Sequence, residues 1–474
     1  MDSTASWLAP VNRLRALNRA DLAVLGFCAL GAGNLWARLG AGNPVVAPVA
    51  ADFVFGFALI ALAGGLCLLA MRRPESLPGA IVCTLAIAAQ AVIQPAFLLP
   101  LQLVYAIGLV LAIVPLVRSP RLGWLLVVCG GLVTAVGVAH AWAWGSSTFD
   151  VFTAVQGATQ ALLHGHNPYG PVFPIFLDSP SGHPIFGSGS LNYGPMVVLL
   201  SLPARLLGDV RLTVVALNLA ILAAILIWAR RGTGSGRATR SIAALWVASP
   251  FIPFMVLTEW TDTFCMAGLA WWLVLRDRHR NWAIVALTVG LASKPSMLPL
   301  MVPLLFWNRA ARLEVLWSAL ATVVIVVPFA LWTGIPQFVY DTVGIYADLL
   351  TRHDSANLNG LASVLGYGLL PGGVLLVGLL ATVALFTLRR PRDYGDLLVA
   401  GAGLLILVCC FGKQAFLNYY FNAAIALLFV VGSGRLVPSG ALRSPLAALM
   451  RLLPKTAPAA ESRAGVGGRD PAAP

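Results

Sequence analysis

Residues 144–192 read WGSSTFDVFTAVQGATQALLHGHNPYGPVFPIFLDSPSGHPIFGSGSLN, and they contain no lysine or arginine. The whole chain carries 31 of these cations. The stretch directly follows an apolar segment, residues 122–142 (LGWLLVVCGGLVTAVGVAHAW), and it holds three of the six histidines. In membrane proteins, loops that face away from the cytoplasm are depleted in lysine and arginine. We therefore expect this loop to lie outside and to carry the chemistry of the protein.

Composition places the chain among membrane proteins. Hydrophobic residues make up 59% and charged residues only 10%, with a mean hydropathy of +0.85. Apolar runs of about 20 residues, enough to cross a bilayer, recur along the chain. The net charge of +13 does not indicate nucleic-acid binding, because the arginines fall in short clusters between apolar runs, as cytoplasmic loops require. The seven cysteines lie inside apolar runs and lack the spacing of a metal site.

Keeping the arginine clusters inside predicts an all-α polytopic protein of about 14 transmembrane helices, with both termini cytoplasmic. The spans are expected near residues 21–39, 49–70, 79–96, 101–117, 122–142, 211–229, 242–258, 262–276, 281–293, 296–307, 314–333, 371–388, 396–411 and 418–434. Residues 193–208 are interpreted as an interfacial half-helix on the outer face. Counting them as a span would place every later arginine cluster outside, and Pro195 and Pro203 make a poor spanning helix.

This topology divides the chain into four parts. Residues 1–20 form a cytoplasmic N-terminus, and residues 21–117 form an N-terminal extension of four helices. Residues 122–435 form the catalytic core, with an outer loop at 143–210. Residues 436–474, rich in Ala, Pro, Gly and Arg, are expected to be a disordered cytoplasmic tail.

Two of the three lysines are unexpected in position. Lys455 lies in the tail, whereas Lys294 and Lys413 lie at the outer ends of spans. A cation costs roughly 2.5–3.5 kcal/mol at the bilayer centre and less toward the interface, so both lysines could simply extend to outer headgroups. Alternatively, two converging ammonium groups suit a phosphate. A phosphate at this depth would belong to a lipid.

The carboxylates of the outer face each have a structural alternative. Asp150 is expected in the first turn of a helix that ends at Gly165, where a carboxylate commonly caps. Asp178 lies in a Pro/Ser/Gly-rich stretch and is interpreted as a solvated turn residue. The turn at residues 258–262 carries Glu259 and Asp262, of which Asp262 could cap the following helix. His164 and His166, two residues apart, do not share a helical face, so we expect no metal pair there.

Several short motifs follow one another along the chain. They are Asp150 just after a span, Gly165-His166-Asn167-Pro168-Tyr169 at the end of a helix, Asn192-Tyr193-Gly194-Pro195 opening an amphipathic helix, Lys294-Pro295, and Lys413-Gln414 followed by Tyr419. In this order they resemble the glycosyltransferase C class, and most of all its polyprenol-phosphate-mannose-dependent alpha-1,2-mannosyltransferases of actinobacterial envelopes. The resemblance covers about residues 122–435. The family often has Tyr-Pro-Pro where this chain has Tyr193-Gly194-Pro195.

The resemblance implies a transfer reaction and assigns roles to residues. It implies that Asp150 is the catalytic base and that the lysine region meets a polyprenyl-phosphate-linked sugar donor. We expect Lys294, Lys413, Tyr193, Gln414 and Tyr419 around the donor phosphate, and His164, His166, Asn167, Tyr169 and Glu259 around the sugar or the acceptor. The acceptor would be a glycan or glycolipid at the outer face of a bacterial plasma membrane. No metal, cofactor or nucleic acid is expected.

A lipid or sugar transporter or flippase is the main alternative, and a sensor or scaffold is a weaker one. Transporters commonly show internal repeats and ionisable groups along a path through the membrane. Here the ionisable groups collect at one face, and no repeat is evident. The pattern favours an interfacial enzyme.

Overall fold

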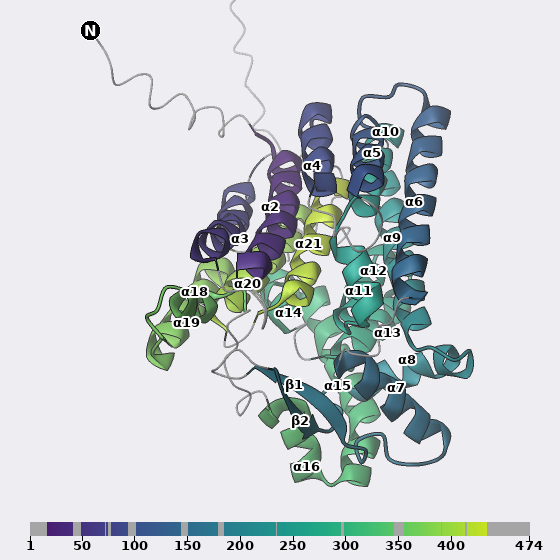
Figure 1. The fold of residues 1–474 in the computed structure, drawn as a ribbon, viewed down its shortest axis with the longest axis vertical. Coiled ribbons are helices and arrows are strands. Elements are labelled where there is room, and N and C mark those ends of the chain that lie inside the picture. Colours follow the sequence, from purple (N-terminus) through teal and green to yellow (C-terminus); the bar gives the residue numbers. More distant parts are fainter. Residues whose placement is uncertain are drawn as a thin grey trace, which may run out of the picture. The chain divides into compact units, whose positions relative to one another are not determined.

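The computed structural model describes residues 17–40, 49–71, 73, 77–92, 101–143, 150–178, 184–233, 235–294, 298–345, 355–368, 370–389, 391–412 and 415–433. Their regular structure is almost entirely helical (Figure 1). The helices are α2 (Arg19–Gly40), α3 (Ala50–Ala70), α4 (Ala80–Val92), α5 (Leu101–Ala112), α6 (Pro120–Ala143), α7 (Asp150–Leu163), α8 (Pro195–Leu206), α9 (Arg211–Thr233), α10 (Gly236–Val247), α11 (Phe251–Thr258), α12 (Asp262–Leu275), α13 (Arg280–Leu291), α14 (Leu298–Trp307), α15 (Arg309–Thr333), α16 (Ile335–Val339), α18 (Leu358–Val364), α19 (Gly372–Leu388), α20 (Tyr394–Phe411) and α21 (Leu417–Gly432). A π-helical turn, η3 (Tyr340–Gly344), follows α16, and two strands, β1 (Phe173–Asp178) and β2 (Pro184–Gly189), lie between α7 and α8.

Five of the described helices are long and apolar enough to cross a membrane, namely α3, α6, α9, α15 and α20. A sixth candidate results if α10 and α11, which meet at 49°, form one span. The other apolar helices are shorter, so the chain is a helical membrane protein but the expected fourteen spans are not confirmed. The expected span at 242–258 is interrupted at Ser249-Pro250, where proline removes a backbone donor.

Helices α20 and α15 occupy different environments. In the 18-residue apolar segment of α20, 83% of the residues are buried, whereas in that of α15 only 6% are buried. Large apolar side chains of α15 remain exposed, among them Leu316, Trp317, Val324 and Leu331. Apolar surface on this scale suits contact with lipid rather than with water. Helix α20 therefore belongs to the core of the bundle, and α15 to its lipid-facing edge.

Polar contacts between distant segments gather at two opposite ends of the helices. At the first end, Arg231 Nη1 donates to the Val274 carbonyl at 2.7 Å and Tyr394 Oη donates to Asp277 Oδ1 at 2.7 Å. Arg240 Nη2 likewise donates to the Val117 carbonyl at 3.3 Å. These contacts join the arginine-bearing turns that the sequence placed on one side. Which side is cytosolic stays a prediction.

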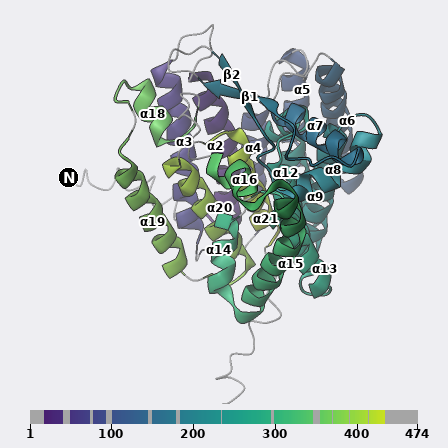
Figure 2. The ribbon, with the colours of Figure 1, turned by 90° about the horizontal axis from the view of Figure 1, so that it is seen from below.

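The second end holds the cation-free loop. Trp142 Nε1 donates to Asp209 Oδ2 at 3.1 Å, and Asn167 Nδ2 donates to Thr333 Oγ1 at 3.1 Å. Figure 1 shows α7, α8, α16 and the strands together at this lower end, and Figure 2 shows the same end from below. The loop therefore lies opposite the arginine-bearing turns, as the charge pattern predicted.

Helix α8 starts and ends at the second end. The Gly194 N–H, just before α8, donates to the Ser293 carbonyl at 2.8 Å. The Gly208 carbonyl, just after α8, accepts from Gln156 Nε2 at 3.3 Å. A helix with both ends on one side cannot cross the bundle, which agrees with the interfacial half-helix expected for residues 193–208.

The strands β1 and β2 form an antiparallel hairpin that the sequence did not predict. Phe173 pairs with Gly189, and Asp178 pairs with Pro184. Asp178 therefore ends a strand, whereas it had been interpreted as a turn residue. Residues 173–178 (FPIFLD) show no apolar–polar alternation and lie in a stretch rich in proline and glycine, which are usually interpreted as loop signals.

The N-terminal helices pack on the core. Helix α2 contacts α21, and helix α3 contacts α20. Helices α2 and α3 also touch each other backbone to backbone. A Cβ placed on Gly56 of α3 would lie 2.1 Å from the Ala37 nitrogen of α2. Small residues allow such close helix contacts in membranes. The predicted division between residues 21–117 and 122–435 stays a prediction.

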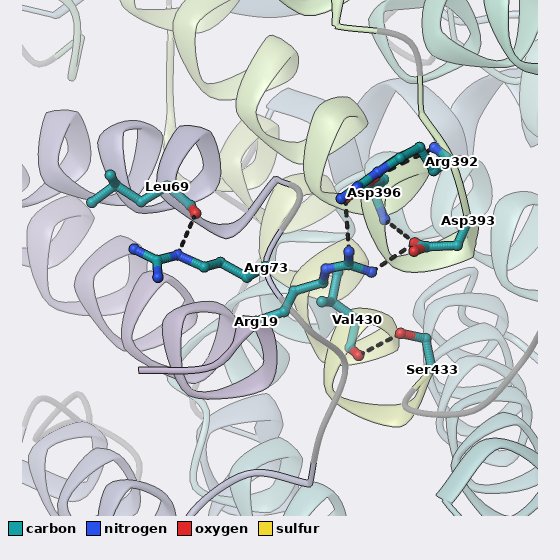
Figure 3. Close-up of polar contacts among 8 residues, drawn as sticks. All are labelled: Arg19, Leu69, Arg73, Arg392, Asp393, Asp396, Val430 and Ser433. Carbon is teal, nitrogen blue, oxygen red and sulfur yellow. Dashed lines mark hydrogen bonds and ion pairs between the residues drawn. The ribbon is translucent and has the colours of Figure 1, made fainter. Parts of the chain in front are cut away.

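An ionic cluster joins α2 to α20 at the first end (Figure 3). Arg19 Nη1 lies 2.6 Å from Asp393 Oδ1, and Arg19 Nη2 lies 2.9 Å from Asp396 Oδ1. Arg392 Nε reaches the other Asp396 oxygen at 3.0 Å. Asp393 also caps α20, because its Oδ1 accepts from the Asp396 N–H. Arg19 and Asp396 are both buried.

We expect Arg19→Gln to lower stability markedly. The substitution leaves buried Asp396 with Arg392 as its remaining cation, and breaking a buried ion pair costs about 3 kcal/mol. Thermal unfolding of the detergent-solubilised protein measures the loss. Arg312→Gln, at an exposed position of α15, is the control and should change the midpoint little. Equal midpoints for the two variants would contradict the assigned role of Arg19.

Candidate functional site

A fully buried carboxylate organises the second end of the bundle. Asp262 is the first residue of α12, and its Oδ2 accepts from Lys294 Nζ at 2.8 Å and from Asn418 Nδ2 at 2.6 Å. Its Oδ1 accepts from Asn422 Nδ2 at 3.1 Å. The asparagines lie one turn apart on α21, so both point to the same carboxylate. Three separate parts of the chain therefore meet at Asp262.

The Lys294 ammonium lies close to two tyrosine rings. Its Nζ is 4.6 Å from the centre of the Tyr419 ring and 5.7 Å from that of Tyr193. Only 4% of Lys294 is exposed. A cation over an aromatic face gains about 0.5–2 kcal/mol, more when water is excluded. Asp262 and the rings together explain how an ammonium group is held in an apolar surrounding.

The position of Lys294 corrects two sequence-based interpretations. Extension of the Lys294 side chain to outer headgroups was one of two alternatives, and the structure instead buries it in a pair with Asp262. Asp262 was weighed as a helix cap, but its carboxylate is bonded by residues 32, 156 and 160 positions away in the sequence. A buried charge is stabilised only by a partner charge and hydrogen bonds, and both are supplied from other helices.

The Asn192-Tyr193-Gly194-Pro195 motif lies directly against the residues that follow α13 and lead to Lys294. The Gly194 N–H donates to the Ser293 carbonyl at 2.8 Å, and the Met196 N–H donates to the Ala292 carbonyl at 3.3 Å. A Cβ on Gly194 would lie 2.1 Å from the Ala292 oxygen. Proline at 194 would lack the N–H and carry a Cβ. The departure from Tyr-Pro-Pro is thus required by this contact.

Asp150 is the first residue of α7, and its Oδ1 accepts from the Val151 N–H at 2.8 Å. The side chain is half-buried. A carboxylate in the first turn is also favoured by the helix dipole. This position agrees with the helix predicted after residue 149, which ends through Gly165 at a φ of 74°. The geometry alone fits both a capping role and a catalytic one.

Arg211 holds the end of α6 against the start of α7, the helix that begins at Asp150. Its guanidinium carbon lies 4.1 Å from the centre of the Trp142 ring in α6 and 4.8 Å from that of Phe152 in α7. Arg211 also pairs with Asp209 at 2.5 Å, and Asp209 accepts from the Trp142 indole. The end of α6 and the start of α7 are thereby fixed against one buried cation.

Glu259 combines two unfavourable features. It is fully buried, and neither carboxyl oxygen has a hydrogen-bond partner within the described part of the chain. Its φ of 54° is the left-handed conformation in which helices usually place glycine. Burial raises the pKa of this carboxyl well above its usual value, and Asp209 raises it further while Arg211 lowers it. Unsatisfied, strained carboxyl groups of this kind are typical of functional sites.

The remaining predicted residues have different surroundings. Tyr169 Oη donates to the Tyr193 carbonyl at 2.8 Å, which ties the segment after α7 to the site. Asn167 bonds Thr333 of α15. His164 and His166 are exposed at the end of α7, where His164 contacts Gln160. Contacts to sugar or acceptor by these four residues stay predictions.

Lys413 and Gln414 lie outside the described residues, but the chain on both sides of them is well anchored. The Gly412 carbonyl accepts from Asn357 Nδ2 at 2.8 Å, and the Ala415 N–H donates to Ser355 Oγ at 2.6 Å.

Among the residues that the structure describes, no three His, Cys, Asp or Glu side chains are grouped so as to hold a metal ion.

Comparison with known protein families supports one general class of enzyme. The model of glycosyltransferase family 87 matches residues 191–412. This match supports a membrane glycosyltransferase, which uses a sugar donor and an acceptor. It includes Tyr193, Glu259, Asp262 and Lys294, whereas Asp150 precedes it and Tyr419 follows it. No curated protein and no solved structure matches the chain.

Sequence reasoning assigned no role in the site to Asp262, Asn418, Asn422 or Arg211. A usable signal existed for Asp262, since it and Lys294 are opposite charges expected on the same side of the membrane. The asparagines stood beside Tyr419 in a polar run at a span end. Their meeting point could not be read from sequence, because it depends on how α12, α13 and α21 pack.

We expect Gly194→Ala to destabilise the protein and to disturb the segment that carries Lys294. The added Cβ meets a backbone carbonyl that cannot move by itself, and overpacking of this kind costs about 1–3 kcal/mol. The thermal midpoint in detergent measures the effect. Gly65→Ala in α3 is the matched control, because no atom lies within 4 Å of its Cβ position. An unchanged midpoint for Gly194→Ala would show that α8 does not dock on α13 in this way.

Proposed function

We propose that the protein transfers a sugar, mannose in our interpretation, from a polyprenyl-phosphate donor to a hydroxyl of a glycan or glycolipid acceptor on the outer face of a bacterial plasma membrane. The observation that carries this proposal is the family match together with the buried Lys294 site inside it. An ammonium group close to two tyrosine rings, at one end of the bundle, suits the phosphate of a lipid, because that phosphate lies at the ends of the membrane spans. The donor is then a substrate, and no separate cofactor is invoked.

In the proposed reaction, Asp150 acts as the base. Its ionised carboxylate takes the proton of the acceptor hydroxyl, whose oxygen attacks the anomeric carbon. The bond from that carbon to the phosphate oxygen breaks, and the lipid phosphate departs with the electron pair. A single displacement of this kind inverts the anomeric configuration, in contrast to the two-step retaining scheme. Base catalysis of this type contributes roughly 10²–10⁴-fold.

The phosphate-binding role falls to Lys294 and Lys413, helped by Tyr193, Gln414 and Tyr419. Positive charge placed where the leaving phosphate gains negative charge stabilises the transition state. Support for Lys294 comes from its buried position close to both tyrosine rings. The contacts that join Tyr169 to Tyr193, and Gly194 to Ser293, connect the segment after α7 with the lysine.

Glu259 is our strongest candidate for contact with the sugar. Burial raises the pKa of this carboxyl group and so favours its protonated form, which can both donate and accept hydrogen bonds. Sugar hydroxyls need both kinds of partner. A bound sugar would also satisfy the two oxygens that lack partners in the described structure. His164, His166, Asn167 and Tyr169 complete the proposed sugar and acceptor region.

We expect Asp150→Asn to abolish transfer of radiolabelled sugar from polyprenyl-phosphate-mannose in membranes. Asparagine keeps the shape and the helix-capping ability of aspartate but cannot take the proton. Protein amount and binding of polyprenyl phosphate should be unchanged. Asp178→Asn, in the same outer loop, is the control. Normal turnover by Asp150→Asn would remove Asp150 from the base role, and absence of transfer by the unmodified protein would favour a transporter.

We expect Lys294→Met to raise the KM for the donor more than it lowers kcat, since it removes charge from the phosphate site. Methionine fills the space between the tyrosine rings, so the loss of charge is separated from a loss of packing. Steady-state transfer at varied donor concentration measures both constants. A donor KM equal to that of the unmodified protein would restrict Lys294 to a structural ion pair with Asp262.

A further inference from the structure

The ion pair between Lys294 and Asp262 has a particular property: each partner is also held by other groups. Asp262 Oδ2 accepts from Asn418 as well as from Lys294, and Oδ1 accepts from Asn422. The carboxylate also belongs to the first turn of α12, where the helix dipole favours negative charge. If the ammonium moved away, both carboxylate oxygens would keep a donor.

Lys294 has support of its own. The Tyr419 and Tyr193 rings lie 4.6 Å and 5.7 Å from its Nζ. Its side chain is long and flexible, whereas the carboxylate of Asp262 is short and fixed by two amides of one helix. In an exchange of partners, the lysine is therefore the group that moves.

The charges make such an exchange necessary. A paired ammonium and carboxylate have no net charge, so together they attract a phosphodiester weakly. A phosphate that arrives beside them competes with Asp262 for one cation. The binding energy of the phosphate must then overcome the existing pair, which lowers its apparent affinity.

We propose that Asp262 is an exchangeable counter-ion, a positioning residue that holds Lys294 until a lipid-linked phosphate takes its place. The proposal rests on the proposed function and adds a residue and a sequence of contacts to it. In the donor-free protein, Asp262 keeps the buried ammonium charged and in position. When the phosphate binds, Lys294 turns to it, and Asn418 and Asn422 retain the carboxylate.

Two substitutions are expected to change phosphate binding in opposite directions. Asp262→Asn removes the competitor, so the apparent Kd for polyprenyl phosphate should fall, by roughly tenfold. Asn422→Ala removes one of the two amides that would still bind the carboxylate after the lysine has moved away. Asp262 then keeps Lys294 more strongly, and the Kd should rise several-fold. Binding of polyprenyl phosphate to the purified protein in detergent is the measurement, so catalysis is not required.

Asp393→Asn is the matched control. Asp393 also pairs with a buried arginine, at the first end of the bundle, and asparagine caps a helix as well as aspartate does. Its Kd should equal that of the unmodified protein. A rise in Kd for both Asp262→Asn and Asn422→Ala would show that Asp262 only holds the lysine in place and would overturn the exchange. No change in either variant would overturn it as well.

A second measurement uses the unmodified protein and serves if Asp262→Asn does not accumulate. The chain has only three lysines, so amine labelling followed by mass spectrometry can follow Lys294 separately. Saturating polyprenyl phosphate should change the labelling rate of Lys294 several-fold and leave that of Lys455 unchanged. An unchanged rate at Lys294 would overturn the proposal. Loss of sugar transfer with intact phosphate binding would count against the proposed reaction but not against the exchange.

Discussion

One buried ammonium group constrains the second end of this protein. Lys294 cannot remain charged in an apolar surrounding without a counter-ion, and Asp262 supplies it. Asp262 in turn needs donors for its other lone pairs, which come from Asn418 and Asn422. The pairing therefore fixes the relative positions of α12, α13 and α21. The rings of Tyr193 and Tyr419 lie at the same place, next to the cation.

The two buried carboxylates of the turn between α11 and α12 have opposite character. Asp262 has a donor at both oxygens, whereas Glu259, three residues earlier, has no hydrogen-bond partner among the described residues and a left-handed backbone. Satisfied charges of the first kind fix structure. Unsatisfied groups of the second kind reduce stability unless a ligand completes them. A satisfied charge at the start of α12 therefore lies three residues from a group suited to binding a polar ligand.

Buried cations are paired with carboxylates at both ends of the bundle. At the first end, Arg19 and Arg392 pair with acidic residues and tie α2 to α20. At the second end, Arg211 and Lys294 are each buried against aromatic rings and each paired with one aspartate. Arg211 joins the end of α6 to the start of α7, whereas Lys294 is the cation that we propose to exchange Asp262 for a phosphate. Arg276 at the first end is held in the same way, against the Trp272 and Trp307 rings and beside Glu314, so this kind of support is shared by both ends.

Much of this architecture follows from sequence alone, because the cost of placing charge in a membrane acts on each segment separately. The apolar runs predicted a helical membrane protein, the arginines predicted which turns lie together, and Gly165 marked the end of α7. The β1–β2 hairpin and the burial of Lys294 were decided only by the tertiary structure. Asp262 meets Asn418 across 156 positions of sequence, and such a contact depends on helix packing, which no local pattern encodes.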